Sequence, residues 1–177
     1  MANWIALFRG INVGGKNILP MKDLIGVLRK SGCTNVQTYI QSGNVVLQSR
    51  QTNASTLARQ IGDAVFDSHG FQPKVMVLSV GKFQEAVDSN PFPKAEAEPK
   101  SLHLFFLSQV PEHPNLEAMN DARSPGESFV IMGKVLYLHA PEGVARSRLA
   151  STAERFVGVD ATARNWRTVS KILALAN

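Results

Sequence analysis

The sequence is poor in cysteine, with Cys33 alone among 177 residues. A single cysteine excludes a disulfide framework within the chain and is typical of a reducing compartment. It also leaves a zinc site incomplete, because the four histidines show no metal-ligand spacing. We therefore expect no metal site and no cofactor, and we expect the protein to be cytoplasmic.

Long hydrophobic runs are absent too. No apolar segment approaches the roughly 20 residues that a membrane span needs. Residues 1–8 are apolar, but they lack the basic leader of a signal peptide and Arg9 interrupts them early. Hydrophobic residues make up 44% of the chain and charged residues 19%, as in ordinary globular proteins. We expect a globular protein with no membrane partner.

Acidic residues are scarce at both ends of the chain. Residues 1–50 hold six lysines or arginines and one acid, Asp23, whereas residues 51–133 hold six basic and ten acidic residues. Residues 134–177 are basic again, with seven basic and three acidic residues. One interpretation is that the two basic ends meet and bind an anion. The alternative is that they dock on the acidic middle or are simply solvated. No carboxylate pair for acid–base chemistry stands out, so the catalytic residues, if any, are unknown.

Hydrophobic patterns in the two halves of the chain are alike in order. Short β-rich runs predict strands over 4–8, 36–40, 45–47, 74–78, 102–107, 129–132 and 135–138. Helical spacing predicts helices over 20–31, 57–69, 81–87, 115–120, 148–156 and 163–176, with Asn53 or Ser55 as a cap and Gly70 as a stop for the second. The first half thus reads β-α-β-β-α-β. The second half reads β-α-β-β-α followed by an extra helix, with no evident final strand.

This order of elements predicts the fold class. It is α+β, with two tandem ferredoxin-like α/β-plait subdomains and an extra C-terminal helix. Residues 91–100 contain prolines and alternate Lys, Glu and Ala, so they are the best candidate for a linker. The expected domains are therefore 1–90 and 101–177, joined by a linker over 91–100.

Four segments carry a family resemblance. They are FRGINVGGKN at 8–17, TYIQSGNVV at 38–46, LYL with PEG within 136–143, and TARNWRTV at 162–169. In order and spacing they resemble a bacterial family of uncharacterised proteins. The resemblance implies a pair of ferredoxin-like α/β plaits. It brings no established activity, substrate or catalytic residue.

The sharpest local motif is a glycine-rich loop, G-x-x-x-x-G-K-N, that starts at Gly10. A phosphate-binding P-loop needs Ser or Thr after the lysine, and here Asn17 follows Lys16. Pro20 also delays the next helix. We therefore reject an NTPase. Two interpretations remain, since Gly14, Gly15 and Lys16 would bind an oxyanion or form a structural loop with positive φ.

The predicted final helix supplies a second candidate. On a helical wheel Arg164, Thr168 and two further cations lie opposite Trp166, so the helix is amphipathic with a basic face. Arg164 falls in its first turn, where a cation opposes the helix dipole. A cation so placed needs an acidic partner or an anionic ligand, and both alternatives stay open.

Arg9 is the third candidate. By strand alternation it shares a face with Ile5 and Leu7 that is expected to be buried. A guanidinium there must be paired, or must lie at the strand end where the sheet meets solvent. The turn at 41–44 offers polar neighbours. Together the three segments give these candidate binding residues: Arg9, Asn12, Gly14, Gly15, Lys16, Gln41, Ser42, Asn44, Arg164, Asn165, Trp166 and Thr168.

Three functions are compatible with these residues. The leading hypothesis is a binding protein with a basic polar site for an anionic small molecule or partner. The alternatives are an enzyme acting on a small phosphorylated or carboxylated metabolite, and a structural or interaction module with no small ligand. RNA recognition by base stacking is disfavoured, because the second hairpin strand at 45–48 has no aromatic residue. Nucleic acid remains a partner only through phosphate contacts, which we do not favour.

Overall fold

The computed structural model describes all 177 residues, which form two compact units. The first unit comprises Met1–Glu85 and Lys171–Asn177, and the second comprises Ala86–Ser170. This division differs from the boundaries expected from the sequence, because the end of the C-terminal helix belongs to the first unit.

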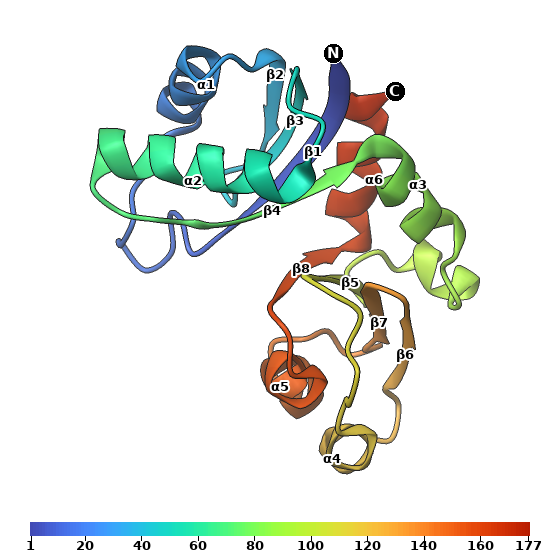
Figure 1. The fold of residues 1–177 in the computed structure, drawn as a ribbon. Helices are drawn as coiled ribbons and strands as arrows, with labels where there is room; N and C mark the ends of the chain where they lie inside the picture. Colours follow the sequence, from blue (N-terminus) through green and yellow to red (C-terminus); the bar gives the residue numbers. More distant parts are fainter. The chain divides into compact units, whose positions relative to one another are not determined.

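The first unit contains one four-stranded antiparallel sheet (Figure 1). Its elements in chain order are β1 (Ala2–Arg9), α1 (Met21–Lys30), β2 (Thr34–Tyr39), β3 (Asn44–Ser49), α2 (Ala54–His69) and β4 (Lys74–Ser79). The strand order is β2-β3-β1-β4, with Ile5 of β1 opposite Val46 of β3 and Leu78 of β4. This is the ferredoxin-like order that the sequence predicts.

The core of this unit lies between the sheet and its two helices. Trp4, Ala6 and Phe8 alternate along β1 and face this core. Helical spacing on α1 and α2 supplies the opposing side chains, which are Leu24, Leu28, Leu57, Ile61 and Val65. The residues between them on β1, Ile5 and Leu7, are also fully buried. Arg9 continues their face but is exposed, because it is the last residue of the strand.

Local signals fix the ends of α2 as expected. The side chain of Asn53 accepts a hydrogen bond from the backbone N–H of Thr56 at 2.9 Å, which satisfies a donor that the first turn leaves open. Gly70 ends the helix with φ of 75° and donates its N–H to the carbonyl of Phe66.

The second unit repeats this arrangement. Its elements are β5 (Leu102–Leu107), α4 (Leu116–Ala122), β6 (Ser128–Met132), β7 (Val135–His139), α5 (Arg148–Val157) and β8 (Ala161–Asn165). The strand order is β6-β7-β5-β8, again fully antiparallel. Side chains of β5 and β7 pack against those of α4 and α5, among them Phe105, Leu138, Met119 and Leu149.

The sequence-based prediction of this unit is corrected in one respect. Ala161–Asn165 is a strand that pairs with β5 from Ala161 opposite Leu107 to Asn165 opposite His103. A helix starting at residue 163 is therefore wrong, since α6 spans Trp166–Ala176. The strand escaped detection because it is five residues long and carries no large apolar side chain. The fold class is confirmed, and the second unit is a complete β-α-β-β-α-β.

Two helical elements lie between β4 and β5. They are α3 (Val80–Asp88) and the 3₁₀ helix η1 (Pro93–Ala97). The expected linker therefore contains a helical turn, and Ala95 within it is buried. None of the helices combines the length and apolar character that a membrane span requires.

Candidate functional site

The glycine-rich loop after β1 is a small hairpin. Val13 and Lys16 form an isolated β-bridge, with the N–H of Lys16 donating to the carbonyl of Val13 at 3.0 Å. Gly14 and Gly15 form the tip with φ of 57° and 71°. α1 begins only at Met21, so the loop does not deliver its N–H groups at a helix N-terminus as a P-loop does. The rejection of a P-loop is consistent with this geometry, and the glycines serve the turn.

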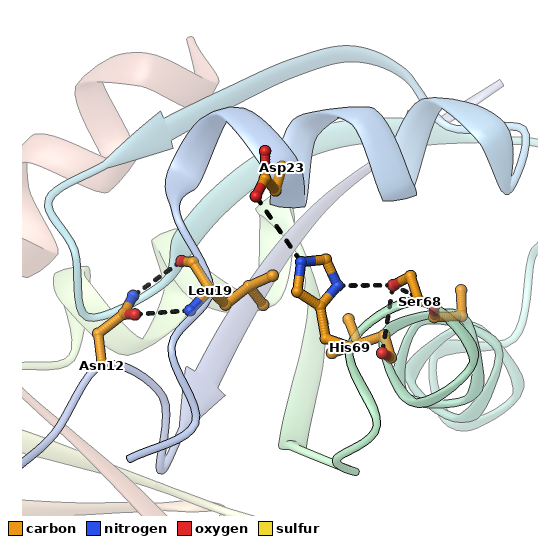
Figure 2. A network of polar contacts seen from close by, with 7 residues as sticks. Asn12, Leu19, Asp23, Ser68 and His69 are labelled. Atoms are coloured by element: carbon orange, nitrogen blue, oxygen red, sulfur yellow. Dashed lines mark hydrogen bonds and ion pairs between the residues drawn. The ribbon is translucent and has the colours of Figure 1, made fainter. Parts of the chain in front are cut away.

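Asn12 holds this loop in place with its side chain. Its Nδ2 donates to the carbonyl of Leu19 at 2.9 Å and to the carbonyl of Gln41 at 2.8 Å. Its Oδ1 accepts from the N–H of Leu19 at 2.7 Å, as Figure 2 shows. Both amide donors are thus occupied by the protein itself. Asn12 therefore orders the loop through three hydrogen bonds.

The turn at 41–44 packs against the same loop. The N–H of Phe8 donates to the carbonyl of Gly43 at 2.8 Å. A Cβ at Gly43 would lie 2.6 Å from Ile11 Cδ1, so only glycine permits this approach. Asn44 is buried and its Nδ2 donates to the carbonyl of Tyr39 at 2.9 Å, which closes the turn. The residue 9–17 loop and the 41–44 turn, predicted as parts of one site, therefore lie side by side in the first unit.

The third predicted segment belongs to the second unit and plays a different structural role. Arg164 lies in β8 opposite Leu104, so its assignment to the first turn of a helix is wrong. Its guanidinium donates to the carbonyl of Ala163 at 2.9 Å, and burial lowers its pKa to about 10. The side chain of Asn165 accepts from the N–H of Thr168 at 2.9 Å and caps α6. Trp166 and Thr168 are buried.

Three apolar residues of the hairpin loop and the turn have exposed side chains. The exposed fractions of Val13, Ile18 and Ile40 are 67%, 56% and 50%. The Asn12 side chain joins its own residue to Leu19 and Gln41. Each exposed apolar residue is a sequence neighbour of one of these three residues: Val13 follows Asn12, Ile18 precedes Leu19, and Ile40 precedes Gln41. Each exposed residue is thus about 3.8 Å along the backbone from one member of that junction. We call Val13, Lys16, Ile18 and Ile40 the Ile40 surface.

The backbone of Ile40 is strained. Its φ is 52°, in the left-handed region that glycine and asparagine adopt readily and β-branched residues avoid. The sequence predicts a strand through Ile40, but β2 ends at Tyr39. The sequence predicts neither the strain nor the exposure of Ile40. The signal available in the sequence was an isoleucine directly before a polar, glycine-containing turn.

A Ser–His–Asp constellation on α1 and α2 resembles a catalytic triad only in composition (Figure 2). The Nδ1 of His69 lies 2.8 Å from the hydroxyl of Ser68, and its Nε2 lies 3.8 Å from a carboxylate oxygen of Asp23. In a triad the serine hydroxyl donates to histidine. Here Ser68 donates to the carbonyl of Ala64 at 2.9 Å, so its proton is already committed. The cluster connects the end of α2 with the start of α1.

Other reactive groups offer little chemistry. Burial raises the pKa of the Cys33 thiol, which keeps it protonated and poorly nucleophilic. No three side chains of His, Cys, Asp or Glu lie close enough to share a metal ion.

Comparisons with known proteins identify a family and a solved structure with a similar fold. The family model described as "Protein of unknown function (DUF1697)" matches residues 1–137, which include the loop and the turn but not the TARNWRTV segment. The solved structure of the conserved bacterial protein SP0830 from Streptococcus pneumoniae is similar, with a TM-score of 0.67 and 21% identity over 99% of each chain. None of the curated proteins matches the sequence.

Proposed function

We propose a binding function for this chain, which belongs to the family of proteins of unknown function DUF1697. In this proposal the Ile40 surface of the first unit binds an anionic partner, specifically an acidic protein segment that also offers apolar side chains. Arg9, at the end of β1 from which the loop departs, adds to the positive charge nearby.

The strain at Ile40 carries the proposal. A non-glycine residue in the left-handed region costs on the order of 1–3 kcal/mol, and such residues cluster at functional sites. Ile40 also leaves half of its side chain exposed to water, which forgoes part of the free energy of burying it. Both features disfavour the folded chain alone. A partner that covers the side chain compensates for them.

The ordering of the loop supports binding as well. Asn17 donates from Nδ2 to the carbonyl of Gly10 at 2.9 Å, and its carbonyl accepts the N–H of Asn12 at 3.1 Å. With the bonds of Asn12, these contacts fix the loop before any partner arrives. A pre-ordered surface loses less conformational entropy on association.

Charge indicates the sign of the partner. Residues 1–50 contain six basic residues and one acid, and Lys16 is exposed next to the loop tip. Three exposed branched apolar side chains in the same loop and turn as Lys16 suit a macromolecular surface better than a small anion, because a small anion contacts few of them. No observation favours turnover of a metabolite. The hydrogen bonds of Asn12, Asn44 and Asn165 support the structural interpretation for those three residues.

The test is a thermal-shift panel with three classes of probe. They are inorganic phosphate and citrate, short RNA and DNA, and synthetic peptides in which Asp or Glu alternates with Leu or Ile. A ligand at 100 times its Kd stabilises by about 2.7 kcal/mol, which such an assay resolves. We expect the acidic apolar peptides to raise the melting temperature most.

Matched variants locate the site. Ile40→Asn and Lys16→Glu are expected to abolish the shift, whereas Phe66→Asn is expected to preserve it. Phe66 is a suitable control because it is equally exposed, at 51%, and lies on α2 in the same unit. An equal shift in Ile40→Asn and the parent would refute the site, and a response to phosphate or citrate alone would favour a small ligand.

A further inference from the structure

The second unit contains an apolar groove of about 480 Å³. It is lined by Val110, Pro114 and Leu116 and by Phe129, Val130 and Ile131 of β6. Val110 and Leu116 are exposed, at 55% and 49%. Its volume falls in the range of pockets that bind ligands.

The groove runs along the edge of a sheet. Phe129 and Ile131 pack toward the helices of the unit, and by alternation Val130 lies on the opposite face of the strand. Because side chains from both faces line the groove, it follows the strand edge and not one face of the sheet. β6 is the outermost strand next to β7 (Figure 1).

The strand β6 itself carries none of the residues that commonly protect an edge strand. Lysine, proline and bulges normally prevent exposed edges from pairing with another chain. β6 reads Ser-Phe-Val-Ile-Met and pairs with β7 without a register shift. The edge strand of the first sheet, β2, differs, since its register shifts between Thr34 and Gln37 and Asn35 has a φ of 49°. β6 is therefore open to strand addition, whereas β2 is distorted.

The hairpin geometry identifies which backbone groups of β6 are available. In an antiparallel pair, successive residues alternate between facing the neighbour strand and facing away. Gly133 and Lys134 form a two-residue hairpin loop, and the residues that flank it, Met132 and Val135, lie opposite each other. In such a hairpin the flanking residues form a hydrogen-bonded pair, so the N–H and C=O groups of Met132 point toward β7. Phe129 and Ile131 therefore direct their N–H and C=O groups to the open edge.

Charges beside the groove indicate the partner. Glu112 lies between Pro111 and Pro114, which line the groove, and Glu117 follows Leu116. Both acids are exposed. Residues 110–122 contain no lysine or arginine. A basic segment is complementary to these acids.

We propose that β6 accepts an added strand from a partner protein, an extended segment in which Val, Ile or Leu alternates with Lys or Arg. Its backbone pairs with Phe129 and Ile131, its apolar side chains enter the groove, and its cations face Glu112 and Glu117. This is β-strand addition, in which main-chain bonds give affinity and pockets for alternate side chains give specificity. The site is separate from the Ile40 surface.

The experiment selects a random twelve-residue peptide library, displayed on phage, against the intact chain. Enriched peptides are then synthesised and their Kd measured by fluorescence anisotropy. We expect alternating apolar and basic residues in the enriched sequences. We also expect the amides of Phe129 and Ile131 to exchange more slowly with deuterium when such a peptide is bound.

A pair of variants separates backbone pairing from apolar contact. Ile131→Pro removes an outward N–H, which an edge strand tolerates, and Ile131→Ala retains it. We expect Kd to rise at least tenfold more in Ile131→Pro than in Ile131→Ala, with circular dichroism confirming that both fold. If Ile131→Pro does not fold, peptides N-methylated at alternate residues replace it, with the same loss expected.

Several results overturn the proposal. They are no enrichment, helical spacing of apolar residues in the enriched peptides, and equal binding to Ile131→Pro and Ile131→Ala. The double variant Glu112→Lys, Glu117→Lys must raise the Kd of the basic peptides at least threefold. An unchanged Kd contradicts a basic partner. A dimer in sedimentation that Ile131→Pro abolishes would assign the edge to a second copy instead.

Discussion

Asn12 donates a hydrogen bond from Nδ2 to the carbonyl of Gln41 at 2.8 Å, although 29 positions separate the two residues. This bond joins the loop after β1 to the turn between β2 and β3. It places two of the family-like sequence segments next to one another. The exposed residues of the Ile40 surface depend on this junction for their positions.

Removal of the Asn12 side chain is expected to destabilise the first unit. Asn12→Ala loses three hydrogen bonds, each of which contributes about 0.5–1.5 kcal/mol. We expect the free energy of unfolding to fall by about 2–3 kcal/mol in urea denaturation. Asn12→Asp retains the acceptor for the N–H of Leu19 and is expected to lose less. A loss below about 0.5 kcal/mol in Asn12→Ala would contradict the role assigned to it.

Ile40→Asn is expected to stabilise the chain. Asparagine adopts the left-handed region more readily than isoleucine, and the replaced side chain is half exposed. We expect the free energy of unfolding to rise by about 0.5–1 kcal/mol, a fraction of the strain. Loss of stability in this variant would mean that the packing of Ile40 outweighs its strain. The measurement is urea denaturation of parent and variant side by side.

His103 is expected to make stability depend on pH. Burial lowers its pKa to about 4, below the 6.5 of an unperturbed histidine, and its Nδ1 makes no hydrogen bond. Between these values the unfolded chain binds a proton that the folded chain excludes, so stability falls as pH falls from 6.5 to 4. The total loss of unfolding free energy is on the order of 2 kcal/mol. This is less than the full pKa shift implies, because solvent reaches part of the side chain and screens its charge.

The variant His103→Leu isolates this contribution. The unfolding free energy of the variant minus that of the parent is expected to increase as pH falls from 7 to 4, because only the parent loses the His103 contribution. The other titrating groups cancel in this difference. A constant difference across this range would show that His103 titrates in the folded state as it does in the unfolded chain.

Tyr137 anchors β7 to the end of α3. Its hydroxyl donates to the carbonyl of Ala86 at 2.6 Å in a buried position. Tyr137→Phe leaves this carbonyl without the bond, so we expect a loss of about 1–2 kcal/mol in thermal or urea unfolding. Leu136→Val, a matched buried change on the same strand, distinguishes loss of the bond from general loosening of the core. Unchanged stability of Tyr137→Phe would contradict the anchor.

Much of the fold follows from local sequence signals. Asn53 and Gly70 are residues whose side chain or backbone freedom favours helix ends in any context, so α2 is readable from the sequence. β8 cannot be predicted from the sequence, because its five residues lack hydrophobic alternation and it is defined by its pairing with β5.

The candidate site is readable only in part. The sequence predicts the loop and the turn as parts of one site, and in the structure Asn12 and Gly43 join the two segments. Ile40 was missed because isoleucine favours strands, whereas its left-handed backbone is imposed by the pairing of Tyr39 with Asn44 across the turn. The sequence places Arg164 in a helix because it does not reveal β8, the strand that contains this residue.

The most direct test of the proposed function is the affinity of Ile40→Asn for the peptide that stabilises the parent most. Isothermal titration calorimetry at a fixed salt concentration gives the Kd of parent, Ile40→Asn and Phe66→Asn. We predict that Kd rises at least tenfold in Ile40→Asn, in a chain that unfolds less readily than the parent, and stays unchanged in Phe66→Asn. Equal affinities of all three chains would contradict a binding role for the Ile40 surface.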